Sequence, residues 1–168
     1  MDEELNSVEE NINGLEAFAT LERFLIDDGW FPQRLEDKYI YRMGYSGSNG
    51  TFTCIAQIRM DLEQFLFYAM APVKTPEERR HAVAEFITRA NYGLRIGNFE
   101  MDYSDGEVRY KSSLDFEDAF LTTNLIRNAI YPAVRTLDRY LGGLLKVIYG
   151  ESDPAELIAE IEDKPRES

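Results

Sequence analysis

The chain has 168 residues, of which 44% are hydrophobic and 12% aromatic. It is therefore long enough for one globular domain with a sizeable core, and its composition excludes a disordered chain. No apolar stretch has the length of a membrane-spanning helix, and the acidic N-terminus lacks the basic and apolar regions of a signal peptide. Cys54 and His81 are the only residues of their types. They cannot form an internal disulfide or a zinc site of Cys and His ligands, so we expect a cytoplasmic protein without a metal or cofactor.

The net charge of −13 is concentrated at the two ends of the chain. Residues 1–28 hold nine acids and one base, and residues 151–168 hold seven acids and two bases, whereas residues 29–150 hold fifteen of each. Acidic ends repel phosphates, so we expect no nucleic-acid partner and no membrane partner. Solubility explains these ends most simply, and an acidic docking tail is the alternative.

The first predicted element is a helix that begins near Ser7, where Ser-Val-Glu-Glu has the form of a capping box. Apolar residues then follow helical spacing until Gly29 ends the helix. Gly14 could divide this stretch, which leaves a shorter helix from Leu15 as an equal alternative.

Three strands are predicted next, over residues 39–45, 51–60 and 64–71, because these stretches are rich in β-branched and aromatic residues. The connections between them are short, which predicts an antiparallel meander. A second helix follows, for which we expect Thr75 as the cap and Pro76 in the first helical position.

A β-hairpin is predicted between Arg95 and Leu114, because two alternating runs flank Asp105-Gly106. If these two residues form the turn, opposing positions sum to 211 and the apolar and charged pairs fall on separate faces. The predicted apolar-face pairs are Tyr103 with Val108, Met101 with Tyr110, and Phe99 with Ser112. The predicted ion pairs are Asp102 with Arg109 and Glu100 with Lys111.

The remaining residues predict two helices. A long helical stretch from Phe116 to about Tyr149 contains Pro132, which should kink it. Asp153-Pro154 then opens a short terminal helix that ends before Pro165. The element order α-β-β-β-α-β-β-α-α predicts an α+β fold with a five-stranded antiparallel sheet flanked by helices. Residues 1–150 would form the single domain, with an acidic N-terminal lead, and residues 151–168 a short acidic helix and tail.

No group of residues predicts catalysis, a cofactor site or a metal site. His81 is expected on the outer face of the second helix, and Cys54 is expected as a buried residue of a strand. The acids of the hairpin do not have the spacing of a calcium loop, and two of them already have predicted basic partners. We therefore expect a protein that is not an enzyme.

Surplus apolar surface is the feature that points to binding. Trp30 and Phe31 lie outside the predicted elements and are candidate contacts for a partner. The alternative is that they seal the core, which we favour more for Phe31 than for Trp30. The long helix is apolar over more than one face, so either the terminal helix or a second copy covers the excess. A homodimer is predicted on this basis, with candidate contacts in the long helix at Leu137, Tyr140, Leu141 and Leu144.

The middle of the chain resembles the YbjN-domain family. The resemblance rests on a linked pattern: Pro76-Glu-Glu-Arg-Arg-His-Ala-Val-Ala-Glu-Phe86, then Asn91, Gly97-Asn-Phe-Glu-Met-Asp102 and Asp105-Gly-Glu-Val-Arg-Tyr110. It extends in element order over residues 15–149. It implies a fold similar to type III secretion chaperones, which are often dimers and bind segments of other proteins without chemistry. It implies no catalytic or ligand residues.

The predicted function is therefore that of a non-enzymatic protein-binding regulator or chaperone-like adaptor. One alternative is a small-ligand-binding protein with a pocket between the sheet and the long helix. The other is a structural subunit of a larger assembly.

Overall fold

The computed structural model describes residues 12–150 and 152–165. Its elements, in chain order, are α2 (Ile12–Asp27), β1 (Gln33–Arg34), β2 (Ile40–Ser46), β3 (Thr51–Arg59), β4 (Gln64–Met70), the 3-10 helix η1 (Glu77–Arg79), α3 (Arg80–Asn91), β5 (Asn98–Met101), β6 (Val108–Asp115), α4 (Thr123–Ile148) and α5 (Pro154–Asp163). The predicted α+β fold is confirmed. The cap predicted at Ser7 lies outside the described residues.

The sheet has six strands within the described residues, in the order β1-β2-β3-β4-β6-β5. Every neighbouring pair is antiparallel. The predicted count of five strands was one too low because β1 has only two residues, both exposed, which is too short to show alternation. The meander of β2, β3 and β4 is confirmed.

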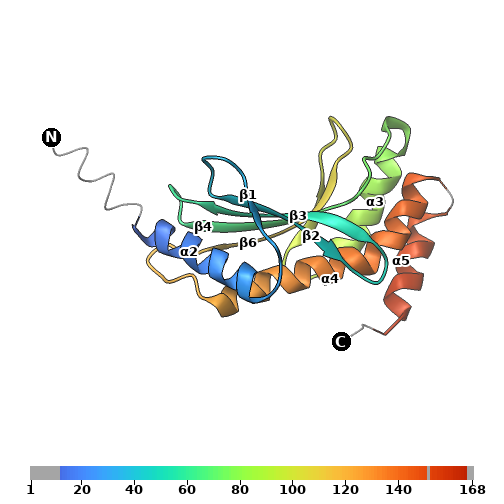
Figure 1. Ribbon diagram of the computed structural model, residues 1–168. Coiled ribbons are helices and arrows are strands. Elements are labelled where there is room, and N and C mark those ends of the chain that lie inside the picture. The colour runs from blue at the N-terminus through green and yellow to red at the C-terminus, as the bar shows by residue number, and fades with distance from the viewer. Residues whose placement is uncertain (1–11, 151, 166–168) are drawn as a thin grey trace.

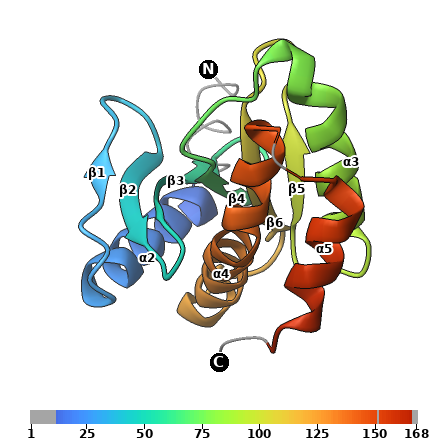
Figure 2. The same ribbon diagram turned by 90° about the vertical axis from the view of Figure 1, so that its right-hand side faces the viewer.

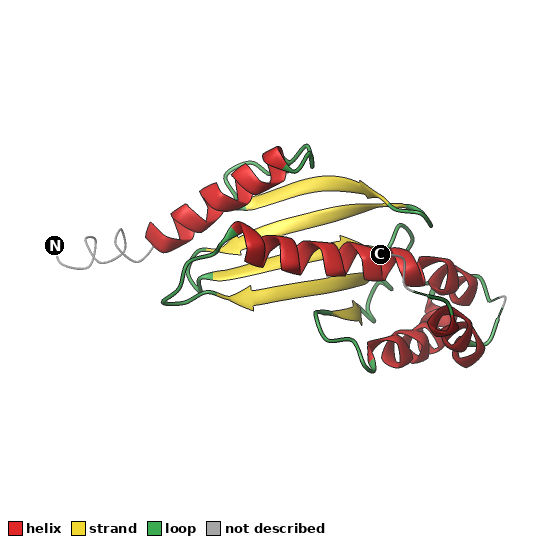
Figure 3. Cartoon of the chain, turned by 90° about the horizontal axis from the view of Figure 1, so that it is seen from below, coloured by secondary structure: helices red, strands yellow, loops and turns green. Residues whose placement is uncertain are grey.

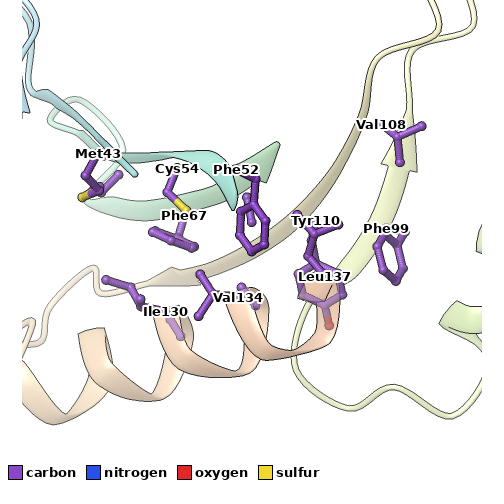
Figure 4. Packing of buried hydrophobic residues seen from close by; sticks show 14 of the residues in the cluster. Met43, Phe52, Cys54, Phe67, Phe99, Val108, Tyr110, Ile130, Val134 and Leu137 are labelled. Carbon is purple, nitrogen blue, oxygen red and sulfur yellow. The ribbon is translucent and has the colours of Figure 1, made fainter. Parts of the chain in front are cut away.

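Helices α2 and α4 lie on the same side of the sheet (Figure 1). Seen from that side, α4 runs in front of the strands and α2 lies along one edge of the sheet (Figure 3). The core lies between them and the sheet, where Cys54, Phe67, Ile130 and Leu137 are fully buried (Figure 4). The strands alternate, as in β3, where Phe52, Cys54, Ala56 and Ile58 face this core and the residues between them face away.

The ends of the helices explain why they begin and stop where they do. In α2, Gly29 takes a φ of +79°, and the Trp30 N–H donates to the Leu25 carbonyl at 2.9 Å, which closes the last turn. The helix α4 begins seven residues after the predicted Phe116, because Thr122 caps it by accepting from the Leu125 N–H at 3.2 Å. It continues through Pro132 to Ile148.

Helix α5 begins as predicted, with Pro154 in its first turn and the Asp153 side chain accepting from the Glu156 N–H at 3.2 Å. It packs beside α3 and the end of α4 (Figure 2). A Cβ added to Gly143 of α4 would lie 2.6 Å from Ile161 of α5 and 3.1 Å from Phe86 of α3, so the three helices approach closely there. Helices α3 and α5 therefore cover the extra apolar width of α4.

The hairpin of β5 and β6 exists, but its predicted register was wrong by two residues. Phe99 opposes Tyr110, and Glu100 opposes Arg109, so opposing positions sum to 209. The loop is longer than two residues because the Gly106 N–H donates to the Asp102 carbonyl at 2.7 Å. A shift by two keeps each side chain on its predicted face.

Two further predictions near the hairpin also need correction. The Asp102 side chain accepts from the Ser104 N–H at 2.8 Å and does not pair with Arg109. Thr75 does not cap the second helix, since its hydroxyl bonds to no backbone group there and α3 is preceded by η1. The reason is that Thr75 is buried against the hairpin, where its N–H donates to the Gly106 carbonyl at 2.7 Å.

Candidate functional site

Among residues 12–150 and 152–165, no helix lies on the sheet face opposite α2 and α4 (Figure 1). We call this surface the open face and define it by the outward residues of β2, β3, β4 and β6. Its centre is apolar and half-buried, and basic side chains border it on both sides. Its apolar and basic residues are Arg42, Ile55, Leu66, Tyr68, Met70, Arg109 and Lys111. The polar residues Thr53, Gln57 and Ser113 face outward beside them.

Strand pairing arranges these residues in rows across the sheet. Arg42 opposes Ile55, Ile55 opposes Tyr68, and Tyr68 opposes Lys111, so one row crosses four strands. Met70 opposes Arg109 in the adjacent row. In these two rows, apolar side chains therefore lie in the middle strands and cations in the outer ones.

Arg109 is held in one orientation by two neighbours. Its guanidinium carbon lies 4.1 Å from the centroid of the Tyr68 ring, a cation–π contact. Its Nε donates to the Glu100 carboxylate, which also accepts from Lys111 Nζ at 2.9 Å. Burial alone would raise the pKa of Glu100, but the hydrogen bonds from Lys111 and Arg109 outweigh it and lower this pKa. Glu100 is therefore a carboxylate that fixes two cations.

The structure reverses the predicted roles of the two aromatic residues before β1. Trp30 is only 7% exposed and its ring stacks on Tyr45 at 5.7 Å between centroids. Phe31 is 91% exposed. Its backbone has a φ of +51°, which is strained for a residue with a Cβ and directs its side chain away from the core that Trp30 enters.

The candidate contacts predicted in α4 are core residues. Tyr140 packs between the rings of Phe86 and Phe99, with centroids 6.3 and 5.7 Å away. The side chains concerned, all buried, are Leu137, Tyr140, Leu141 and Leu144. Of the six predicted partner contacts, Phe31 alone is exposed to a partner in this conformation.

Sequence reasoning missed the open face, although a signal for it was present. Residues 64–71 read as a nearly continuous apolar strand, and a strand that is apolar at consecutive positions has apolar side chains on both faces. Phe65 and Phe67 face the core, so Leu66 and Tyr68 necessarily face the other side.

The two residues considered for catalysis, Cys54 and His81, lie apart, one buried in β3 and one on the outer side of α3. Cys54 is fully buried, and burial raises the pKa of its thiol to about 12, so it is not a reactive thiolate. His81 is exposed on α3, as expected. Among the described residues, no group of three or more His, Cys, Asp or Glu side chains could hold a metal ion. None of the described helices combines the length and hydrophobicity needed to cross a membrane.

The space between the sheet and α4 is filled by side chains. Phe67, Val134 and Leu137 meet where the ligand-binding alternative places a pocket (Figure 4). Two shallow hollows of about 360 Å³ lie instead on the outside of the molecule, one along α2 and one beside its first turn. The packing argues against the predicted internal pocket.

The motif residues that resemble the YbjN family hold the hairpin against α3. The Asn91 side chain accepts from the Phe99 N–H at 2.7 Å and donates to the Phe99 carbonyl at 3.0 Å, so it occupies the outer edge of β5. Gly97 and Gly106 have positive φ and lie against Tyr110 and Thr75. An amide that satisfies both backbone groups of an edge residue blocks pairing with another strand. These motif residues are therefore structural, whereas Glu100 and Arg109 of the same motif lie at the open face.

The architecture is that of an α+β protein with one antiparallel sheet and helices on one side. A family model for YbjN, described as "Putative bacterial sensory transduction regulator", matches residues 17–145. The chain belongs to the YbjN family. One solved structure that it resembles is "Crystal structure of YbjN, a putative transcription regulator from E. coli", with a TM-score of 0.57 and 12% identity over 79% of this chain and 92% of that chain. At that identity the likeness shows the fold alone. No curated protein matches the chain.

Proposed function

We propose that this protein is a non-enzymatic regulator that acts by binding another protein on the open face. The observation that carries the proposal is an apolar sheet surface, bordered by cations, that no helix of the described chain covers. A sheet in a layered fold usually has one face on the core, and an uncovered apolar centre on the other face is typical of an interaction surface. The description of the family as a regulator supports the same class of function. The chaperone-like adaptor is one form that such binding could take.

The residue types of the open face suit a specific contact. Tyr and Arg are enriched among the residues that dominate binding energy, and here Tyr68 and Arg109 already contact each other. Glu100 orders Arg109 before a partner arrives, which reduces the entropy lost on binding. Fully burying Ile55 or Leu66 in an interface would contribute about 1–2 kcal/mol each.

A photo-crosslinking amino acid at position 66 tests this proposal in cells. We expect it to capture a recurrent protein that the same group at Asn124, an exposed position of α4, does not capture. The capture should be lost in a Tyr68→Glu background whose melting temperature is close to that of the wild type. Identical capture from both positions, or none from position 66, would contradict the proposal.

A further inference from the structure

Helix α2 has a second apolar stripe that faces away from the core. Its buried side is formed by residues such as Leu21 and Leu25. On the opposite side, Ile12, Leu15 and Ile26 are 52%, 49% and 58% exposed, and Ala19 is exposed between them. At about 100° per residue these four positions fall within about 60° of the helix circumference. A helix that is apolar on opposite sides is normally covered on both.

Two of the charges beside this stripe, one acidic and one basic, lie at nearly equal distances from Ala19. Glu16 precedes Ala19 by one turn and Arg23 follows it by one turn, and helical geometry places both on the same flank of the stripe. Neither side chain has an ion-pair partner among the described residues. A shallow hollow of about 360 Å³ lies over the same region and is lined by Ala19, Glu22, Arg23, Ile26 and Asp27.

We propose that α2 pairs with α2 of a second copy of this chain, antiparallel and around a two-fold axis at Ala19. In this arrangement Ile12 of one copy lies beside Ile26 of the other, and the small Ala19 side chains allow the helices to approach closely. A two-fold axis brings the same flank of both helices together. Glu16 of each copy therefore meets Arg23 of the other, which forms two identical ion pairs.

The self-complementary charge pattern is the reason for choosing a second copy as the occupant. An acid and a base placed nearly symmetrically about a small central residue satisfy each other when the same helix is reversed, whereas an unrelated partner does not require this symmetry. The helix is about 24 Å long, so the contact is smaller than a standard protein interface and the dimer should be reversible.

The dimer would also have a consequence for binding. Helix α2 lies on the side of the sheet away from the open face (Figure 3), so pairing through α2 leaves both open faces uncovered. Such a dimer would present two copies of that surface and bind a repeated or clustered partner with increased avidity.

Sedimentation equilibrium of the full chain over a range of concentrations tests the pairing. We expect a reversible dimer for the wild type and a monomer for Ala19→Arg. Glu16→Arg and Arg23→Glu should each raise the dissociation constant by about tenfold or more, because each places like charges together twice. The double variant Glu16→Arg/Arg23→Glu should restore the dimer.

Lys146→Glu, at an exposed position of α4, is the control and should leave the dimer unchanged. Circular dichroism shows whether each variant is folded. We expect all of them to fold, because the substituted positions are exposed. A monomeric wild type, an Ala19→Arg variant that still dimerises, or a double variant that stays monomeric would overturn the proposal.

Discussion

Gly106 is the position where a single methyl group should be most damaging to the fold. Its φ is +78°, and a Cβ built there lies 1.9 Å from the carbonyl oxygen of Thr75. Gly106→Ala therefore combines a positive-φ strain of about 1 kcal/mol with a backbone clash. Relieving the clash displaces the segment before α3 and breaks the 2.7 Å bond from the Thr75 N–H to the Gly106 carbonyl. Overpacking and the lost bond add about 2 kcal/mol or more, so we expect a total loss of about 3 kcal/mol or more.

Gly29→Ala is a matched control for this prediction. Gly29 has nearly the same φ, +79°, but nothing lies within 4 Å of its added Cβ. The control should therefore lose only the strain of about 1 kcal/mol. The difference between the two variants isolates the contact with Thr75.

Urea unfolding followed by the fluorescence of Trp30, the single tryptophan, measures both losses. For a chain of this size, a loss of about 3 kcal/mol corresponds to a fall in melting temperature of about 6–12 °C. Gly106→Val, with a β-branched side chain, should lose still more. Equal losses for Gly106→Ala and Gly29→Ala would refute the argument that the hairpin is locked against Thr75.

Three further predictions follow from single contacts. Asn91→Ala removes two hydrogen bonds to the Phe99 backbone, so it should lower the free energy of unfolding by about 2 kcal/mol. It also frees the β5 edge for pairing with another strand, so light scattering at high concentration should increase. A stable variant that does not aggregate would contradict the edge role. Because the pKa of Glu100 is lowered in the folded state, its stabilising effect is present above its unfolded pKa and is lost as pH falls through the folded value. The stability difference between wild type and Glu100→Gln should therefore be largest near neutral pH and shrink below about pH 4, and a difference that does not depend on pH would count against it. Cys54 should resist alkylation until the chain unfolds, since its pKa is raised to about 12 and its side chain is buried; rapid labelling of the native protein would show that the core opens locally.

Local signals predicted most of the elements of this fold. Asp153-Pro154 marks the start of α5 because the cap and the fixed proline φ act within one turn. The hairpin was recognised for a similar reason, but its register was not. The loop length depends on two contacts. The Asp102 side chain accepts a hydrogen bond from the Ser104 N–H, and Gly106 lies against Thr75, which is far away in the chain. Tertiary contacts of this kind have no local signature.

The candidate contacts were harder to predict than the elements. Trp30 and Phe31 are adjacent aromatic residues, and composition does not say which of them enters the core. The choice depends on the positive φ of Phe31. Likewise, the sequence showed that α4 is apolar on more than one face. It did not show which residues cover the additional face, because Phe86 and Ile161 belong to other helices.

The edge strand β5 is closed to further pairing, whereas the two proposed binding surfaces are exposed. The motif shared with the YbjN family lies where α3 and the hairpin meet, and Asn91 there closes the β5 edge. The open face includes Arg109 and Lys111 of the same hairpin, whereas α2 lies on the other side of the sheet (Figure 1). A change at Tyr68 or Ala19 should therefore alter binding while leaving the fold intact, whereas a change at Gly106 should destabilise the fold itself.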